Sequence, residues 1–133
     1  NVSGEESNYN DAITAAFAKF GLSNPTTLLN GAYKYPAAGT FQEKLEAIIT
    51  QKWVASVNQG IESFFDQSRT GIPKISNVPA ADPAYIPSQW TYSIEGVTGG
   101  KFPKRLIYPD ISRRVNSNTP AFEPLTTKVW WAN

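Results

Sequence analysis

The sequence contains neither cysteine nor histidine. Without cysteine, the chain has no disulfide, no thiolate metal site and no cysteine nucleophile. Without histidine, it lacks the commonest metal ligand and the commonest general base near neutral pH. A Ser-His-Asp triad and a histidine-bearing zinc site are therefore excluded within these 133 residues. We predict no catalytic residue, no metal ligand and no cofactor.

The chain also lacks a charge surplus of either sign. Its 12 Lys and Arg residues nearly balance 11 Asp and Glu residues, leaving a net charge of +1. A nucleic-acid-binding domain gathers a basic surplus on one face. The closest basic cluster here is only the pair Arg113 and Arg114, so we expect no nucleic-acid partner.

Long apolar runs are absent as well. No stretch approaches the roughly 20 apolar residues that span a bilayer, and no signal peptide opens the chain. The length of 133 residues fits one domain at most. The chain begins with Asn1 and not Met, so either a segment was cleaved away or the chain is a piece of a longer polypeptide. We expect the second, because of the packing argument given below for residues 72–133.

Residues 7–71 carry a helical pattern. The first predicted helix runs from Ser7 to Phe20, and Gly21 stands where a left-handed C-terminal cap is expected. Its apolar residues recur at spacings of three and four: Tyr9, Ile13, Ala16, Phe17 and Phe20. A connector over residues 22–39 follows, in which Tyr33 and Tyr35 are expected to lie against the helices.

The second predicted helix opens with a capping box, in which Thr40 and Glu43 satisfy each other's backbone donors. One apolar stripe then continues through Phe41, Leu45, Ile48, Ile49, Trp53 and Val57. A short third helix follows from Ile61 to Ser68, and Gly71 stops it. The short turn between these two helices predicts an αα-hairpin.

Residues 72–133 hold eight of the ten prolines and no helical periodicity. Proline removes a backbone donor and disfavours the α conformation in the residue before it, so no long helix fits. Short extended pieces remain at Trp90–Ile94, Arg105–Tyr108 and Lys128–Trp131.

This proline-rich half is nevertheless rich in aromatic residues, which disordered segments lack. A long irregular segment is unusual inside a compact domain of this size, and three short helices offer little area to cover it. We therefore expect residues 72–133 to pack on a helical body that is largely supplied by the rest of a longer protein. The predicted organisation is one region, 1–133, forming its C-terminal part.

Trp90 and Tyr92 are the candidate ligand contacts. In an extended segment, the i, i+2 spacing places both rings on one face, and aromatic rings stack on sugars and other flat ligands. Glycines and prolines around them indicate a surface loop, where binding residues are often found. The alternative is that both rings pack on the helical half, which is the commoner fate of large aromatic residues.

Two carboxylate pairs raise the alternative of a glycoside hydrolase, which needs two carboxyls at a defined separation. The pairs are Glu43 with Glu46 and Glu62 with Asp66. Each pair shares one side of a helix, so solvation, capping or surface pairing explains them better. No loop gathers the several oxygen ligands of a calcium site.

Four segments resemble one known pattern. They are residues 45–55 (LEAIITQKWVA), 58–73 (NQGIESFFDQSRTGIP), 103–109 (PKRLIYP) and 126–131 (TTKVWW). In this order they resemble the C-terminal region of SusD/RagB-family proteins, in particular the SusD-like lipoproteins of Bacteroidetes. Two departures stand out: Ser68 occupies a position where the family often has arginine, and Phe64-Phe65 replaces a commoner tryptophan-containing pair.

The resemblance implies a mainly α fold, namely the C-terminal part of a tetratricopeptide-like SusD fold with three helices before a long irregular, aromatic-rich segment. It implies a protein at the extracellular face of the outer membrane, anchored by lipid on an N-terminal Cys outside this chain. It also implies non-catalytic capture of a glycan or peptide and delivery to a SusC-like TonB-dependent transporter. The alternative function is a structural helical-repeat scaffold that contacts another protein.

Overall fold

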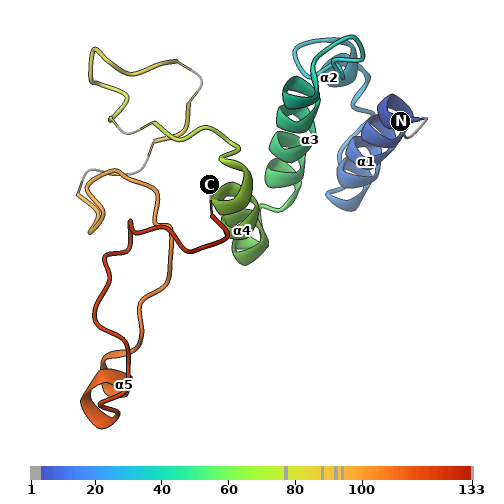
Figure 1. The fold of residues 1–133 in the computed structure, drawn as a ribbon. Coiled ribbons are helices and arrows are strands. Elements are labelled where there is room, and N and C mark those ends of the chain that lie inside the picture. Colours follow the sequence, from blue (N-terminus) through green and yellow to red (C-terminus); the bar gives the residue numbers. More distant parts are fainter. Residues whose placement is uncertain (1–3, 77, 88, 92, 94, 133) are drawn as a thin grey trace. The chain divides into compact units, whose positions relative to one another are not determined.

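The computed structural model describes residues 4–132 except 77, 88, 92 and 94. The described part of the chain forms five helices and no sheet (Figure 1). They are α1 (Glu5–Lys19), α2 (Thr26–Asn30), α3 (Phe41–Ala55), α4 (Gly60–Thr70) and α5 (Asp110–Val115). The predicted mainly α fold is thereby confirmed.

The chain divides into two compact units, residues 1–66 and residues 67–133. We call them unit 1 and unit 2 and describe each by itself. The expected packing of residues 72–133 on a helical body stays a prediction.

The first predicted helix is confirmed to within two residues at each end. Gly21 adopts a φ of 67°, a conformation that glycine tolerates without strain. The amide of Leu22 donates to the Phe17 carbonyl over 2.9 Å, and the amide of Gly21 donates to the Ala18 carbonyl over 3.1 Å. This pair of bonds is a Schellman cap, which satisfies carbonyls that the helix end leaves free.

The core of unit 1 forms where α1 meets the connector that follows it. Tyr9, Ile13 and Tyr35 are buried together, and the rings of Tyr9 and Tyr35 lie 5.2 Å apart. The Tyr9 hydroxyl donates to the Tyr33 carbonyl over 2.9 Å, so a buried polar tip has its partner. Tyr35 lies against the helices as predicted, whereas the ring of Tyr33 stays half exposed.

The capping box of α3 is confirmed. The Thr40 hydroxyl accepts from the Glu43 amide over 3.3 Å, and the Glu43 carboxylate accepts from the Thr40 amide over 2.7 Å. The helix packs on α1, but only Ile49 of its predicted apolar stripe is buried among the residues described. Two helices that pack on each other bury only a narrow strip of each helix surface. Phe41, Ile48 and Val57 therefore remain exposed.

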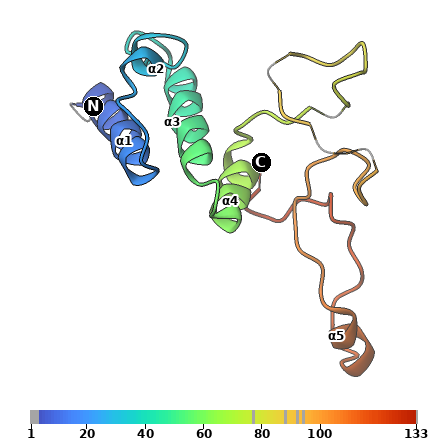
Figure 2. The same cartoon turned by 180° about the vertical axis from the view of Figure 1, so that it is seen from behind.

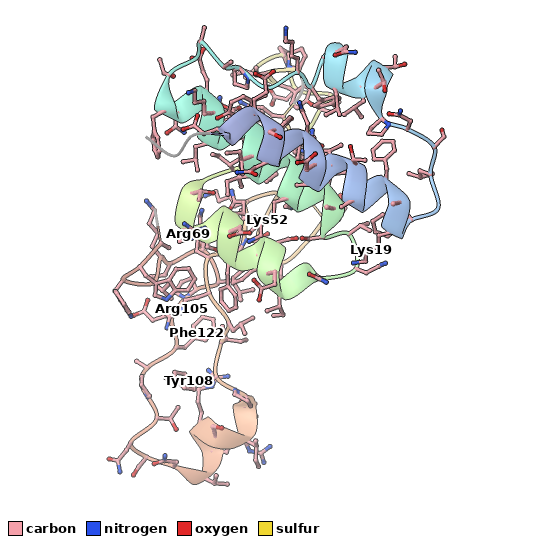
Figure 3. The ribbon with its side chains drawn as sticks, turned by 90° about the vertical axis from the view of Figure 1, so that its right-hand side faces the viewer. Lys19, Lys52, Arg69, Arg105, Tyr108 and Phe122 are labelled. Carbon is pink, nitrogen blue, oxygen red and sulfur yellow. The ribbon has the colours of Figure 1, made fainter. Side chains whose placement is uncertain are left out.

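The third predicted helix is α4. It ends at Thr70, and the next residue, Gly71, has a φ of 72° and donates its amide to the Gln67 carbonyl over 2.8 Å. Lys52, labelled in Figure 3, places its ammonium 2.6 Å from the Asp66 carboxylate and so ties α3 to α4.

Two short helices were not predicted from the sequence. In α2, the Asn24 side chain accepts from the amide and the hydroxyl of Thr26, over 3.0 Å and 2.6 Å. In α5, Asp110 opens the helix and Arg113 and Arg114 close it, an order that suits the helix dipole. Six residues fit between Pro109 and Pro120, so the proline pattern limits helix length without excluding a helix.

None of the three extended pieces belongs to a sheet in the part of unit 2 that the structure describes. One isolated parallel bridge joins Ile75 to Trp90. A single backbone hydrogen bond of 2.7 Å links the Lys104 amide to the Leu125 carbonyl. No described helix is long and apolar enough to cross a membrane.

Candidate ligand-binding site

The backbone of Trp90 is held at both of its polar groups. Its carbonyl accepts from the Ser76 amide over 2.7 Å, and its amide donates to the Lys74 carbonyl over 3.1 Å. These two bonds flank Ile75 and make the parallel bridge. Trp90 is therefore fixed to the segment that follows α4, even though no sheet surrounds it.

The segment on the other side of this bridge is partly buried. Ile72 is only 2% exposed, and Pro73 and Ser76 are buried as well. The Thr70 hydroxyl accepts from the Ile72 amide over 3.1 Å, and the Ser76 hydroxyl accepts from the Val78 amide over 3.2 Å. The segment that binds the backbone of Trp90 is therefore itself held by apolar burial and by local hydrogen bonds.

The loop that leads into Trp90 is braced by its own side chains. The Asp82 carboxylate accepts from the Ala84 amide over 2.8 Å, which is the local turn geometry that Asp favours. The Tyr85 hydroxyl then donates to the Gln89 carbonyl over 2.6 Å. The residue immediately before Trp90 is thus held by a ring that the sequence analysis had not singled out.

The indole of Trp90 meets solvent on one side. The residue is 49% exposed, so part of its ring area is open to a ligand while its backbone is held. A partly exposed ring on a held backbone offers apolar area to a ligand without a large ordering cost. Tyr92, the second predicted ligand contact, lies outside the described residues.

The tryptophan pair at the end of the chain lies in a turn and not in the predicted extended piece, and the Ala132 amide donates to the Val129 carbonyl over 3.0 Å. Trp130 is 95% exposed, whereas Trp131 is partly buried. Among the described residues, no β-bridge like the one at Trp90 holds the backbone of Trp130. Trp130 is therefore exposed but less well fixed, which makes it a weaker candidate for ligand contact.

Unit 1 contains an open apolar cavity that the sequence did not predict. It has a volume of about 800 Å³ between α1 and α3. Its walls are almost wholly apolar and include Ile13, Phe17, Phe20, Leu22, Ile48 and Val54. A ligand site combines apolar walls with a few placed polar groups, and a sugar needs such groups for its hydroxyls. The unit 1 cavity suits an apolar side-chain surface better than a glycan.

Two of the four carboxylates that the sequence pairs have partners within unit 1. Glu43 serves the capping box, and the hydrogen bonds from the Thr40 amide and hydroxyl lower its pKa. Asp66 is buried and pairs with Lys52. Among the residues described, no group of three or more Asp and Glu side chains could hold a metal ion. Capping accounts for Glu43 as predicted, whereas Asp66 is buried in an ion pair and does not lie on the surface as expected.

One charged cluster links the start of α1 to α3. The Glu5 carboxylate accepts from the Lys44 ammonium over 3.0 Å and from the Tyr35 hydroxyl over 3.0 Å. The hydrogen bond from Lys44 lowers the pKa of Glu5, and the same bond raises the pKa of Lys44. Burial raises the pKa of Tyr35. All three groups keep their ordinary charge at neutral pH, so this cluster is structural.

Comparison with known proteins identifies one family. A model described as SusD-like, covering the SusD and RagB outer membrane lipoproteins, matches residues 2–132. No curated protein matches the chain. The match spans both units, so the cluster of unit 1 and the Trp90 support of unit 2 are parts of one family region.

Proposed function

Because the chain belongs to the SusD/RagB family of outer-membrane lipoproteins, which bind nutrients for uptake, we propose a specific role for it. It forms part of a cell-surface protein that captures a glycan or a peptide and delivers it to a SusC-like TonB-dependent transporter. The protein performs no catalysis in this role. The proposal includes a lipid anchor on an N-terminal Cys beyond this chain and an extracellular-facing position.

The observation that carries the capture hypothesis is the half-exposed indole of Trp90 on a fixed backbone. A ligand gains most from contacts that are already ordered before it arrives. The bonds to Lys74 and Ser76 order the backbone of Trp90, and the Tyr85 bond orders the residue before it. Full burial of Trp90 would have favoured a purely structural role.

The alternative function, a helical scaffold that contacts another protein, is favoured by a different observation. Exposed apolar side chains line the cavity of unit 1, among them Phe20 directly after α1 and Val54 on α3. Contiguous exposed apolar area of this kind marks a surface that another part of a protein covers. The two functions use different units and are separable by experiment.

The test of nutrient capture uses the whole polypeptide that contains this chain. It is screened against glycan and peptide libraries, with tryptophan fluorescence as the readout. Saturable binding of one ligand class, with a spectral change that depends on Trp90, supports capture and decides between glycan and peptide. Absence of binding to every member of both libraries contradicts it and leaves the scaffold function.

A further inference from the structure

Helix α2 ends in an asparagine that a glycine follows, and this is the only Asn-Gly pair in the sequence. Asn30 and Gly31 are both exposed, and α2 lies at one end of the α1–α3 pair in two views (Figures 1 and 2). Asparagine is a chemically labile residue, because the next backbone nitrogen can attack its side-chain carbonyl carbon and close a five-membered ring. The pair is therefore a candidate for a spontaneous covalent change.

The backbone nitrogen that would close this ring is weakly held. The Gly31 amide donates to the Leu28 carbonyl over 3.3 Å, which is longer than the usual backbone hydrogen bond. Helix α2 has five residues, and so short a helix is marginal because its few hydrogen bonds barely repay the ordering of its backbone. The Gly31 nitrogen is thus not locked into a strong helical hydrogen bond.

The Asn30 side chain is not restrained by local bonds either. It makes no hydrogen bond within the part of the chain that the structure describes. The Asn116 side chain, by contrast, accepts from the Asn118 amide over 2.9 Å. Asn24 precedes Pro25, whose nitrogen carries no hydrogen to lose. Of these three asparagines, Asn30 alone combines an unbonded side chain with an unhindered amide after it.

The packing of α2 explains why a glycine follows Asn30. A Cβ at Gly31 would lie 2.9 Å from the Thr27 carbonyl oxygen, which is too close for a side chain without a shift of the backbone. The Gly31 carbonyl also accepts from the Lys34 amide over 3.2 Å, so the chain turns at once. The close approach that excludes a side chain places after Asn30 the residue that hinders ring closure least.

We propose that Asn30 is a site of spontaneous deamidation in the folded protein. The Gly31 nitrogen gives its proton to hydroxide and bonds to the side-chain carbonyl carbon of Asn30. The bond from that carbon to the side-chain nitrogen breaks, and ammonia leaves with a proton from water. Water then opens the cyclic imide at either carbonyl, giving aspartate or isoaspartate. The step needs no oxidant, reductant or cofactor, and it does not depend on nutrient capture.

The products alter a turn that supports the core of unit 1. Leu28 and Leu29 pack against the buried cluster, and the Tyr33 carbonyl accepts from the Tyr9 hydroxyl over 2.9 Å. Isoaspartate routes the backbone through the former side chain and so lengthens it by one carbon between these two contacts. Both products also place a carboxylate at the C-terminal end of α2, where negative charge is unfavourable. Deamidation therefore weakens unit 1, and isoaspartate does so more than aspartate.

The first test follows Asn30 and Asn116 in the full-length protein during incubation at mildly alkaline pH. Peptide mass spectrometry detects the replacement of an amide by an acid at each asparagine. Asn30 should convert at least about tenfold faster than Asn116, which corresponds to a barrier lower by about 1.4 kcal/mol. Asn30→Gln should stop conversion at that position and leave the rate at Asn116 unchanged. Equal rates at the two asparagines overturn the proposal.

A parallel incubation in urea separates reactivity of the fold from reactivity of an unfolded chain. Asn30 should convert in the native sample as well as in urea, and conversion confined to urea overturns the proposal. The isoaspartyl fraction, isolated by chromatography, is then compared in urea unfolding with Asn30→Asp, which carries the same charge on an unaltered backbone. It should unfold at a lower urea concentration than Asn30→Asp, and equal midpoints overturn the weakening of unit 1 by the lengthened backbone.

Discussion

The buried side chains of the two units differ in kind. In unit 1, the buried apolar set is Tyr9, Ile13, Tyr35 and Ile49, whereas the described part of unit 2 buries Ile72 as its one large apolar side chain. Unit 2 buries Gln67, Ser68 and Ser76 instead. Of these, only the Ser76 hydroxyl has a hydrogen-bond partner for its oxygen, whereas Gln67 Oε1 and Ser68 Oγ are buried without one among the described residues. Unit 1 is therefore stabilised mainly by removing apolar area from water, and the loop of unit 2 before Trp90 is held by local hydrogen bonds. A region with few buried apolar side chains can thus still hold an aromatic residue in a fixed position, provided that hydrogen bonds order its loops.

The strongest way to break this comparison is to open the core of unit 1. Replacing Ile13 with alanine should lower the free energy of unfolding by about 2–5 kcal/mol, because the cavity left beside Tyr9 and Tyr35 closes only in part. Urea unfolding followed by circular dichroism measures the loss. Val54→Ala on exposed α3 surface is the matched control and should change stability by less than about 0.5 kcal/mol. Equal losses would show that Ile13 is not in a core.

The capping box gives a smaller effect within the same unit. Thr40→Ala removes the oxygen that accepts from the Glu43 amide and should cost about 1 kcal/mol. Thr40→Ser retains that oxygen and should restore most of the stability, again measured by urea unfolding. A serine variant as unstable as the alanine variant would mean that the threonine methyl group, and not the cap, is what matters.

Unit 2 should respond to loss of a hydrogen bond more than to loss of area. Tyr85→Phe keeps the ring but removes the bond to the Gln89 carbonyl, at a cost of about 1 kcal/mol. We expect faster amide exchange over residues 82–91 and little change in unit 1, as hydrogen-exchange mass spectrometry can resolve. Tyr108→Phe is the control for removing a tyrosine hydroxyl at an exposed position. Unchanged exchange in Tyr85→Phe would contradict a braced loop.

The smallest effect concerns pH. The bond from Lys44 lowers the pKa of Glu5 below its ordinary value of 4.5, so its carboxylate stabilises the fold above that pH. The contribution is lost as pH falls through the lowered pKa. Glu5→Gln should reduce stability slightly at pH 7, and its difference from the native protein should vanish in acid. Thermal unfolding across this range checks the sign; a difference that grows in acid would contradict it.

Periodicity and end signals in the sequence predicted unit 1 well. The Thr40–Glu43 cap and Gly21 are local features whose chemistry is complete within a few residues, so spacing alone is informative. The stripe of α3 was only half informative, because periodicity tells which side of a helix is apolar and not what covers it. Phe41 and Val57 follow the period and yet remain exposed.

Sequence reasoning found less of unit 2 and of the candidate site. Trp90 was singled out by its spacing from Tyr92. Its backbone, however, is held by hydrogen bonds to Lys74 and Ser76, more than ten residues away in the chain. No local sequence pattern reveals such a contact. Helix α5 was not predicted because closely spaced prolines argued against any long helix. The proline-free stretch between Pro109 and Pro120 is nevertheless long enough for a six-residue helix. Pro109 followed by Asp110, with arginines in the last turn, was the available clue.

The central claim is that Trp90 forms part of the nutrient site, and its affinity contribution tests that claim most directly. Trp90→Ala and Trp130→Ala are compared by isothermal titration of the full-length protein with the ligand found in the library screen. We predict that Trp90→Ala weakens binding by about tenfold or more, while Trp130→Ala leaves it unchanged. Native affinity in Trp90→Ala, or an equal loss in both variants, would contradict the account.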